Sequence, residues 1–231
     1  MTGSFWSDTA RRLGAGLTLC AGFAGAGGAQ TVCEAGNVTV LTQDPAQAAF
    51  LCDSVASGLS KLAACNVTLH HPVTVELRDR LSAGCMGVYH CGEDRIELLT
   101  PEAMAATRNP DGRLAFVETQ TYFQSILVHE LAHAAYAEVP CPFGSCLATN
   151  EYVANTMQVM SLPAADIARL EADLDMETRL SRDSLNPFLY LMAPDIFLRK
   201  AWVHLKQRPD PCAYIGQIME GRVLLDYERY D

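Results

Sequence analysis

Alternating apolar and β-branched residues predict strands in the first half of the chain. The stretches "NVTVLT" (37–42) and "VTVELRD" (73–79) have this pattern. "GVYHCGEDRIELLT" (87–100) reads as two short strands around a turn at Gly92 and Glu93. We therefore expect a small sheet built from the first hundred residues.

A second pattern, apolar residues at helical spacing, predicts helices between and after these strands. Residues 44–64 begin with Asp and Pro, which favour the cap and first turn of a helix. A long helix is predicted over 115–137, and two prolines and a glycine in "VPCPFGSC" (139–146) end it. A second helix is expected from about Asn150 to Leu162. "PAADIARLEADLDMETRL" (163–180) reads as an acidic amphipathic helix with a solvated face.

The order of strand, helix, strands and then helices predicts the α+β class, with a small mixed sheet packed on helix 115–137. The remainder, to about Leu225, is expected to be mainly helical. The chain is long enough for one domain, which we place at 30–231. Its two lobes are about 30–137 and about 138–231, and any cleft should lie between them.

The N-terminus has the features of a targeting signal. Arg11 and Arg12 precede an apolar, uncharged run that ends in small residues, and cleavage after Ala26 or Ala29 fits this pattern. A membrane anchor is the alternative, but the run is short and rich in Gly and Ala. We therefore expect residues 1–29 to be a signal peptide, with no stable membrane span after its removal. The protein would be exported, to the periplasm or the medium.

Composition narrows the classes of partner. The net charge is −10, and 49% of the residues are hydrophobic. This apolar fraction is enough to form a core. An acidic chain disfavours nucleic acid and anionic membranes as partners.

The cysteines support export. The chain has nine, and loss of Cys20 with the signal leaves eight, an even number that permits up to four disulfides. The pairs easiest to close are Cys141 with Cys146 and Cys85 with Cys91. A structural zinc site is the alternative, although the spacings are wider than those of tight zinc hooks.

The stretch "SILVHELAHAAYAE" (125–138) contains the candidate metal-binding and catalytic residues. Residues four apart share one face of a helix, so His129 and His133 can present two imidazoles to one metal ion. Glu130 then lies beside the ion, where it could act as general base on an activated water. The alternative is a packed helix that carries two histidines.

Catalytic zinc usually takes a third protein ligand. The metzincin arrangement would need Gly and His where the chain has Tyr136 and Val139. Glu138 is rotated away from the ligand face of the helix. Glu151, which lies near the start of the next predicted helix after a short loop, is the better candidate.

With Glu151, the chain resembles the gluzincin metallopeptidases, which join H-E-x-x-H to a glutamate on a following helix. Several carry N-E-x-x-A around that glutamate, as Asn150, Glu151 and Ala154 do here. The resemblance covers residues 73–160. It implies a zincin-like fold and zinc bound by His129, His133 and Glu151, with Glu130 as general base.

The resemblance also implies two further features of the site. Zincins place an edge strand beside the active helix for substrate backbone to pair with, and the predicted hairpin at 87–100 could supply it. Gluzincins often have an acidic residue four positions after the ligand glutamate to orient a histidine. This chain has Asn155 there, an amide that can still accept an imidazole N–H.

We therefore expect an exported zinc metallopeptidase that acts on a peptide or protein substrate. One alternative is a catalytically inactive zincin-like domain that binds zinc or a protein. Another is iron chemistry, because two histidines and a carboxylate also form a facial triad. The residue that would stabilise the transition state stays open, with Tyr190, His204 and Tyr214 as candidates in the second lobe.

Overall fold

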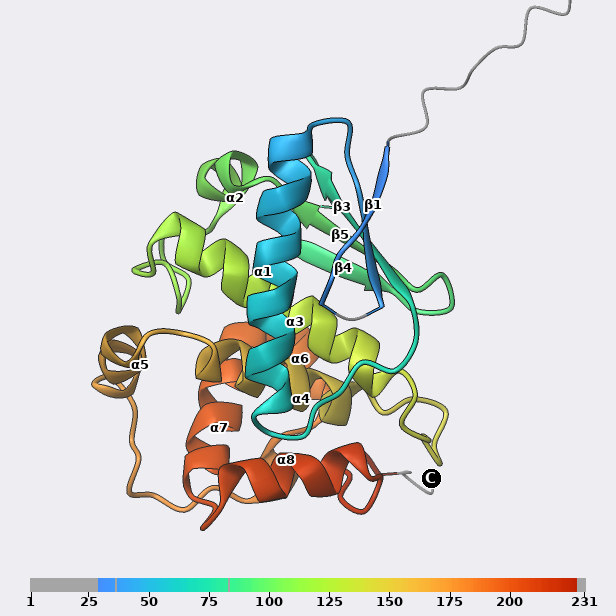
Figure 1. Ribbon diagram of the computed structural model, residues 1–231. Helices are drawn as coiled ribbons and strands as arrows, with labels where there is room; N and C mark the ends of the chain where they lie inside the picture. Colours follow the sequence, from blue (N-terminus) through green and yellow to red (C-terminus); the bar gives the residue numbers. More distant parts are fainter. Residues whose placement is uncertain (1–28, 36, 83, 228–231) are drawn as a thin grey trace, which may run out of the picture.

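The computed structural model describes residues 29–35, 37–82 and 84–227. The predicted signal segment lies outside these residues, apart from Ala29. Within the described part, the protein is α+β, as predicted, with one five-stranded mixed sheet and eight α-helices (Figure 1).

The sheet has the strand order β1-β2-β3-β5-β4. Its strands are β1 (Gln30–Val32), β2 (Val38–Leu41), β3 (Val73–Arg78), β4 (Gly87–His90) and β5 (Arg95–Leu99). The three inner strands are parallel, whereas β1 and β4 are antiparallel to their neighbours at the two edges. The predicted strands are confirmed, and β1 is an addition. The hairpin at 87–100 therefore supplies an edge strand, β4.

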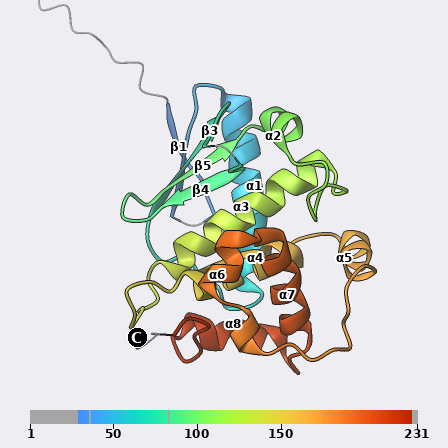
Figure 2. The same ribbon diagram turned by 180° about the vertical axis from the view of Figure 1, so that it is seen from behind.

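The helices form the rest of the fold. They are α1 (Pro45–Ala63), α2 (Pro101–Thr107), α3 (Thr119–Tyr136), α4 (Leu147–Met160), α5 (Ala164–Glu171), α6 (Pro187–Met192), α7 (Pro194–Lys206) and α8 (Pro211–Met219). In Figures 1 and 2, α1 and α3 lie against the sheet. Helix α4 packs on α3, and α6, α7 and α8 gather around α4. Helix α3 thus separates the sheet from the C-terminal helices.

Several helix ends differ from the prediction, and side chains explain two of them. Helix α3 begins at Thr119 rather than at 115, because the Glu118 carboxylate accepts hydrogen bonds from two backbone N–H groups of its first turn. The helix predicted over 163–180 ends at Glu171. Asp175 accepts two backbone N–H groups in a local turn beyond it, which competes with helix formation.

Three disulfides join six of the eight described cysteines. They are Cys33–Cys52, Cys65–Cys212 and Cys141–Cys146. The last pair confirms the prediction.

The predicted pair Cys85–Cys91 is wrong, because both cysteines are free. They flank β4, whose four residues are extended. At about 3.3 Å per residue, a strand of this length holds them farther apart than the roughly 7 Å between Cα atoms that a disulfide tolerates.

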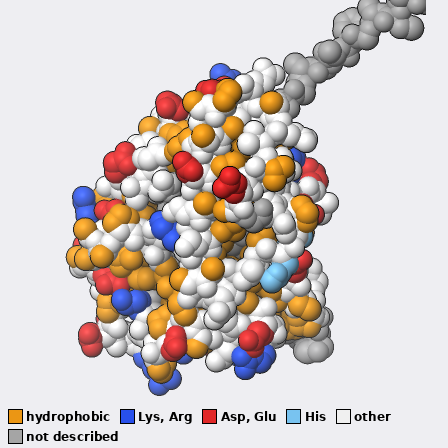
Figure 3. All heavy atoms as spheres, in the orientation of Figure 1, with side chains coloured by type: hydrophobic (Ala, Val, Ile, Leu, Met, Phe, Trp, Pro, Cys, Tyr) orange, Lys and Arg blue, Asp and Glu red, His pale blue; other side chains and the backbone are white. Residues whose placement is uncertain are grey.

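On the face drawn in Figure 3, charged side chains of both signs are interspersed. Among the described residues, no helix is both long and apolar enough to cross a membrane.

Candidate metal centre

Helices α3 and α4 bring His129, His133 and Glu151 together, as the sequence predicts. Their potential ligand atoms all lie within 4.8 Å of one another. The two Nε2 atoms are 3.0 Å apart. The Glu151 carboxylate oxygens lie 3.8 Å from Nε2 of His129 and 3.7 Å from Nε2 of His133. All three side chains are largely buried.

The start of α4, which carries Glu151, is held from two directions. The Cys141–Cys146 disulfide closes the loop between α3 and α4. Cys146 provides no side-chain cap, and Asp226 from the far end of the chain supplies one instead. Its carboxylate accepts the backbone N–H groups of Ala148 and Thr149 at 3.0 and 2.9 Å. The first turn of α4 is therefore fixed, which sets the direction of Glu151.

A chain of hydrogen bonds sets the tautomer of His129. The Ser125 hydroxyl donates to the Tyr122 carbonyl, and its oxygen then accepts from Nε2 of Gln158. This orientation turns Oε1 of Gln158 to Nδ1 of His129, at 3.1 Å. An amide oxygen only accepts, so Nδ1 carries the proton and Nε2 presents a lone pair to the site.

His133 is oriented in the same way by Asn150, whose Oδ1 lies 2.8 Å from Nδ1. The two Nε2 atoms therefore both present lone pairs, 3.0 Å apart. Neither ring can donate a hydrogen bond to the other, because each carries its proton on Nδ1. A cation between them would satisfy both. Tetrahedral zinc, with bonds of about 2.0–2.2 Å, requires ligand atoms about 3.3 Å apart. The three observed separations bracket that value, so the three side chains could hold a metal ion with bonds of this length.

Burial shifts the pKa values of His129 and Glu151. Burial, followed by the proximity of His133, lowers the pKa of His129 well below its usual value. Burial likewise raises the pKa of Glu151, against the opposing effect of His133. Both shifts favour uncharged side chains in the absence of a cation.

Asn155 and Tyr190 contact Glu151. Asn155 donates from Nδ2 to the Glu151 carboxylate at 3.2 Å and to its carbonyl at 2.7 Å. We expected Asn155 to orient a histidine, and this is wrong, because Gln158 and Asn150 fill that role.

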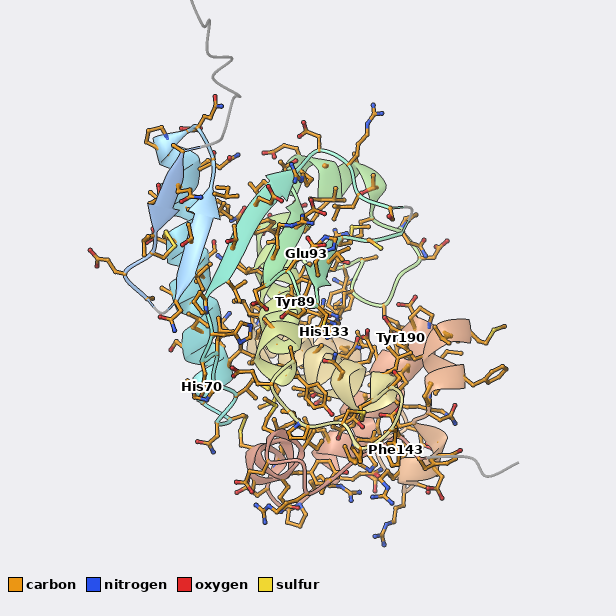
Figure 4. All side chains as sticks on the ribbon, turned by 90° about the vertical axis from the view of Figure 1, so that its right-hand side faces the viewer. His70, Tyr89, Glu93, His133, Phe143 and Tyr190 are labelled. Atoms are coloured by element: carbon orange, nitrogen blue, oxygen red, sulfur yellow. A yellow bond between two sulfur atoms is a disulfide. The ribbon has the colours of Figure 1, made fainter. Side chains whose placement is uncertain are left out.

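The Tyr190 hydroxyl donates to the Glu151 carboxylate. In Figure 4, His133 lies between Tyr89 of β4 and Tyr190 of α6.

Glu130 is buried beside the three donors, under the edge strand. The Cβ that a side chain would add at Gly87 of β4 would lie only 2.7 Å from Cγ of Glu130. The backbone of Tyr89 also hydrogen-bonds the carboxylate. Burial, helped by the charge of Glu151, raises the pKa of Glu130 to about 7, whereas His133 and the Tyr89 backbone oppose the shift.

An open cleft of about 480 Å³ leads to these residues. Its floor includes His129, Glu130 and Glu151. Residues 84–87 before and at β4 form one wall, and Tyr190 and Leu198 of α6 and α7 contribute to the opposite one. The cleft thus lies between the sheet and the C-terminal helices, where the sequence predicts it.

Among the candidates for a transition-state residue, only Tyr190 lies in this cleft. His204 and Tyr214 pack together elsewhere, around the ring of Tyr152. Tyr152 follows Glu151 on α4, and successive residues of a helix point about 100° apart. Its side chain therefore leads away from the candidate metal centre.

Sequence reasoning missed Gln158, Gly87 and Asp226. A signal existed for Gln158, which lies seven residues, about two turns, after Glu151 and thus on the same face of α4. No local pattern marks Gly87 or Asp226, because each acts on a residue distant in the sequence.

The fold and the site together define an α+β protein with a candidate metal centre of two histidines and a glutamate. By its sequence, the chain belongs to the family described as "Family of unknown function (DUF6639)", whose model matches residues 38–228. This range includes every residue of the site described above. No curated protein and no solved structure matches the chain.

Proposed function

We propose that this protein is an exported zinc-dependent metallopeptidase of the gluzincin type, with a zincin-like fold. One observation carries the proposal: His129, His133 and Glu151 converge in a cleft, with Glu130 buried next to them. The three disulfides are compatible with export. The H-E-L-A-H spacing, the following glutamate and the adjacent edge strand match the arrangement expected of that class.

In the proposed reaction, the metal and the side chains of the protein would have separate roles. Bound zinc would polarise the scissile carbonyl and lower the pKa of a water molecule. Glu130 would accept a proton from the attacking water and return it to the leaving amine. The carboxylate is held for this by Gly87 and the Tyr89 backbone on one side and by α3 on the other.

The walls of the cleft fit an extended peptide. Strand β4 is hydrogen-bonded to β5 on one side, and no strand of the described residues pairs with its other edge. Substrate backbone could pair with this edge. Tyr190 lines the same cleft, and its hydroxyl would have to exchange its hydrogen bond to Glu151 for one to the charge developing on the substrate oxygen.

The test begins with elemental analysis of the purified, oxidised protein, beside the variants His133→Ala and Glu151→Ala. We expect one zinc per chain, lost or weakened in both variants. Glu130→Gln should keep the metal and lower peptide hydrolysis by about 10²- to 10⁴-fold. Glu102→Gln, on the exposed face of α2, is the matched control and should change neither.

The outcomes separate the alternatives. Iron in place of zinc would favour facial-triad chemistry, and absence of metal after reconstitution with zinc would overturn the proposal. Zinc binding with no peptidase activity on a peptide library, in wild type and Glu130→Gln alike, would favour a non-catalytic zinc-binding domain.

A further inference from the structure

A second cavity, of about 500 Å³, lies among the C-terminal helices and shares no lining residue with the cleft. Among the residues that the structure describes, three arginines line it and no carboxylate does. Its lining consists of Arg179, Leu180, Ser181, Arg182, His204, Arg208, Tyr214 and Val223. In a chain of net charge −10, such a concentration of positive charge around one cavity needs an explanation.

His204 provides a buried polar group at this cavity. Its side chain lines the cavity, although the residue is only 2% exposed. A hydrogen bond of 2.9 Å joins its Nδ1 to the Tyr152 hydroxyl. Its Nε2 has no hydrogen-bond partner within the part of the chain that the structure describes. The nitrogen left for a ligand is therefore Nε2.

The arginines are available to a ligand. None of Arg179, Arg182 and Arg208 has a carboxylate within 4.0 Å among the described residues. Arg208 is half-buried and already positioned: its Nε donates to the His204 carbonyl at 3.1 Å, and its guanidinium lies over the Tyr214 ring. The terminal N–H groups of Arg208 remain free to donate. Arg179 and Arg182 are exposed at the rim.

Hydrogen bonds and a disulfide hold the segments that line this cavity in place. Gln207 accepts the backbone N–H of Leu180 and donates to the carbonyls of Met176 and Thr178. These bonds hold the segment that carries Arg179 against the end of α7. The Cys65–Cys212 disulfide ties α8, with Tyr214, to the end of α1. The cavity is therefore held in shape before a ligand arrives, which lowers the entropic cost of binding.

We propose that this cavity binds a small organic phosphate or sulfate, with Arg208 and Nε2 of His204 at its base and Arg179 and Arg182 at its rim. Guanidinium groups match the geometry of such oxyanions and bind them through charge-assisted hydrogen bonds. The cavity exceeds the size of one tetrahedral oxyanion, and Leu180, Tyr214 and Val223 offer contacts to an organic body. The overall negative charge of the protein argues against a nucleic-acid ligand.

The experiment is a calorimetric titration of the full mature protein with phenyl phosphate and with inorganic phosphate, at constant ionic strength. Phenyl phosphate should bind more tightly, because its ring adds apolar contact. Arg208→Gln should weaken binding by about tenfold or more, as expected for loss of a charged hydrogen bond. Arg182→Gln leaves the packed core untouched and should weaken binding by a few-fold. The matched control Arg222→Gln, which removes an exposed arginine paired with Glu220, should change nothing.

Three results would overturn the proposal. The first is the absence of saturable binding at millimolar phenyl phosphate. The second is equal binding by wild type, Arg182→Gln and Arg208→Gln. The third is binding lost in His133→Ala but kept in Arg182→Gln, which would place the anion at the metal centre instead.

Discussion

At the scale of single residues, Gly87 shows how one missing side chain shapes the site. A Cβ at this position would lie 2.8 Å from Oε1 of Glu130 and 2.8 Å from Cδ2 of Leu98. We predict that Gly87→Ala destabilises the protein by about 1–3 kcal/mol through overpacking. It should also displace Glu130, so that peptide hydrolysis falls while zinc stays bound.

Urea unfolding, zinc content and activity of Gly87→Ala test this prediction. Gly216→Ala is the matched control, because nothing lies within 4 Å of its added Cβ in α8, and alanine favours helices. A Gly87→Ala protein with wild-type stability and activity would show that the strand does not hold the carboxylate.

Gln158 contacts the candidate metal centre through His129. The substitution Gln158→Leu keeps the volume of this buried side chain but removes the acceptor for Nδ1 of His129. The ring could then rotate or change tautomer, so we predict that zinc affinity falls by about 10- to 100-fold.

Competition with a chelator measures the zinc affinity of Gln158→Leu. Thr156→Val is the control, because it removes another buried polar group of α4, one that bonds only to backbone carbonyls of its own helix. Equal zinc affinity in wild type and Gln158→Leu would contradict the role given to Gln158.

At the scale of elements, Asp226 connects the end of the chain to the start of α4. Asp226→Ala leaves two buried backbone N–H groups and the Thr149 hydroxyl without their acceptor. We predict a loss of about 1–3 kcal/mol in stability and, because the turn before Glu151 loosens, weaker zinc binding.

The comparison that isolates this effect is Asp210→Ala, which removes the cap of α8. Its stability should fall by about 1 kcal/mol, with zinc affinity unchanged. If both variants bound zinc like wild type, α4 would be fixed by its disulfide and packing alone.

Most individual elements could be predicted from local sequence. Helix α1 could be predicted from its capping residue and first-turn proline, and the hairpin turn from Gly92. These signals act within a few residues of the chain, so the sequence alone reveals them. Helix ends were harder to predict, because they also depend on distant residues. Gln207, 27 residues after Leu180, accepts the Leu180 N–H and holds the segment after α5. The candidate ligands His129, His133 and Glu151 could be predicted from helical spacing and a short loop, whereas the roles of Gly87 and Asp226 required the three-dimensional structure.

At the scale of the whole molecule, the position of the cleft followed from the order of elements, but the links between distant segments did not. Eight cysteines allow 105 pairings. The structure joins Cys65 to Cys212, 147 residues apart, because α1 and α8 meet below the sheet. Such contacts depend on packing that involves the whole chain.

The stability of the whole protein should depend on pH through His204, which links α7 to Tyr152 of α4. Burial, together with the charges of Arg208 and Arg182, lowers the pKa of His204 to about 4. In the unfolded chain the pKa is about 6.5. Below that value the unfolded chain binds a proton that the folded protein does not, so stability falls as pH decreases from about 6.5 to about 4 and is constant above this range.

We predict a loss on the order of 2 kcal/mol across this window, less than the full pKa shift would give, because solvent in the adjoining cavity screens part of it. Burial raises the pKa of Tyr152 and Tyr214 beside the ring, so both stay uncharged in this window and His204 is the group that responds. Urea unfolding of wild type and His204→Gln, in buffers free of phosphate and sulfate, isolates its contribution. The variant should lose this part of the pH dependence, since glutamine can bond to Tyr152 but does not titrate. Parallel pH profiles for the two proteins would show that His204 is protonated in the folded state as readily as in the unfolded chain.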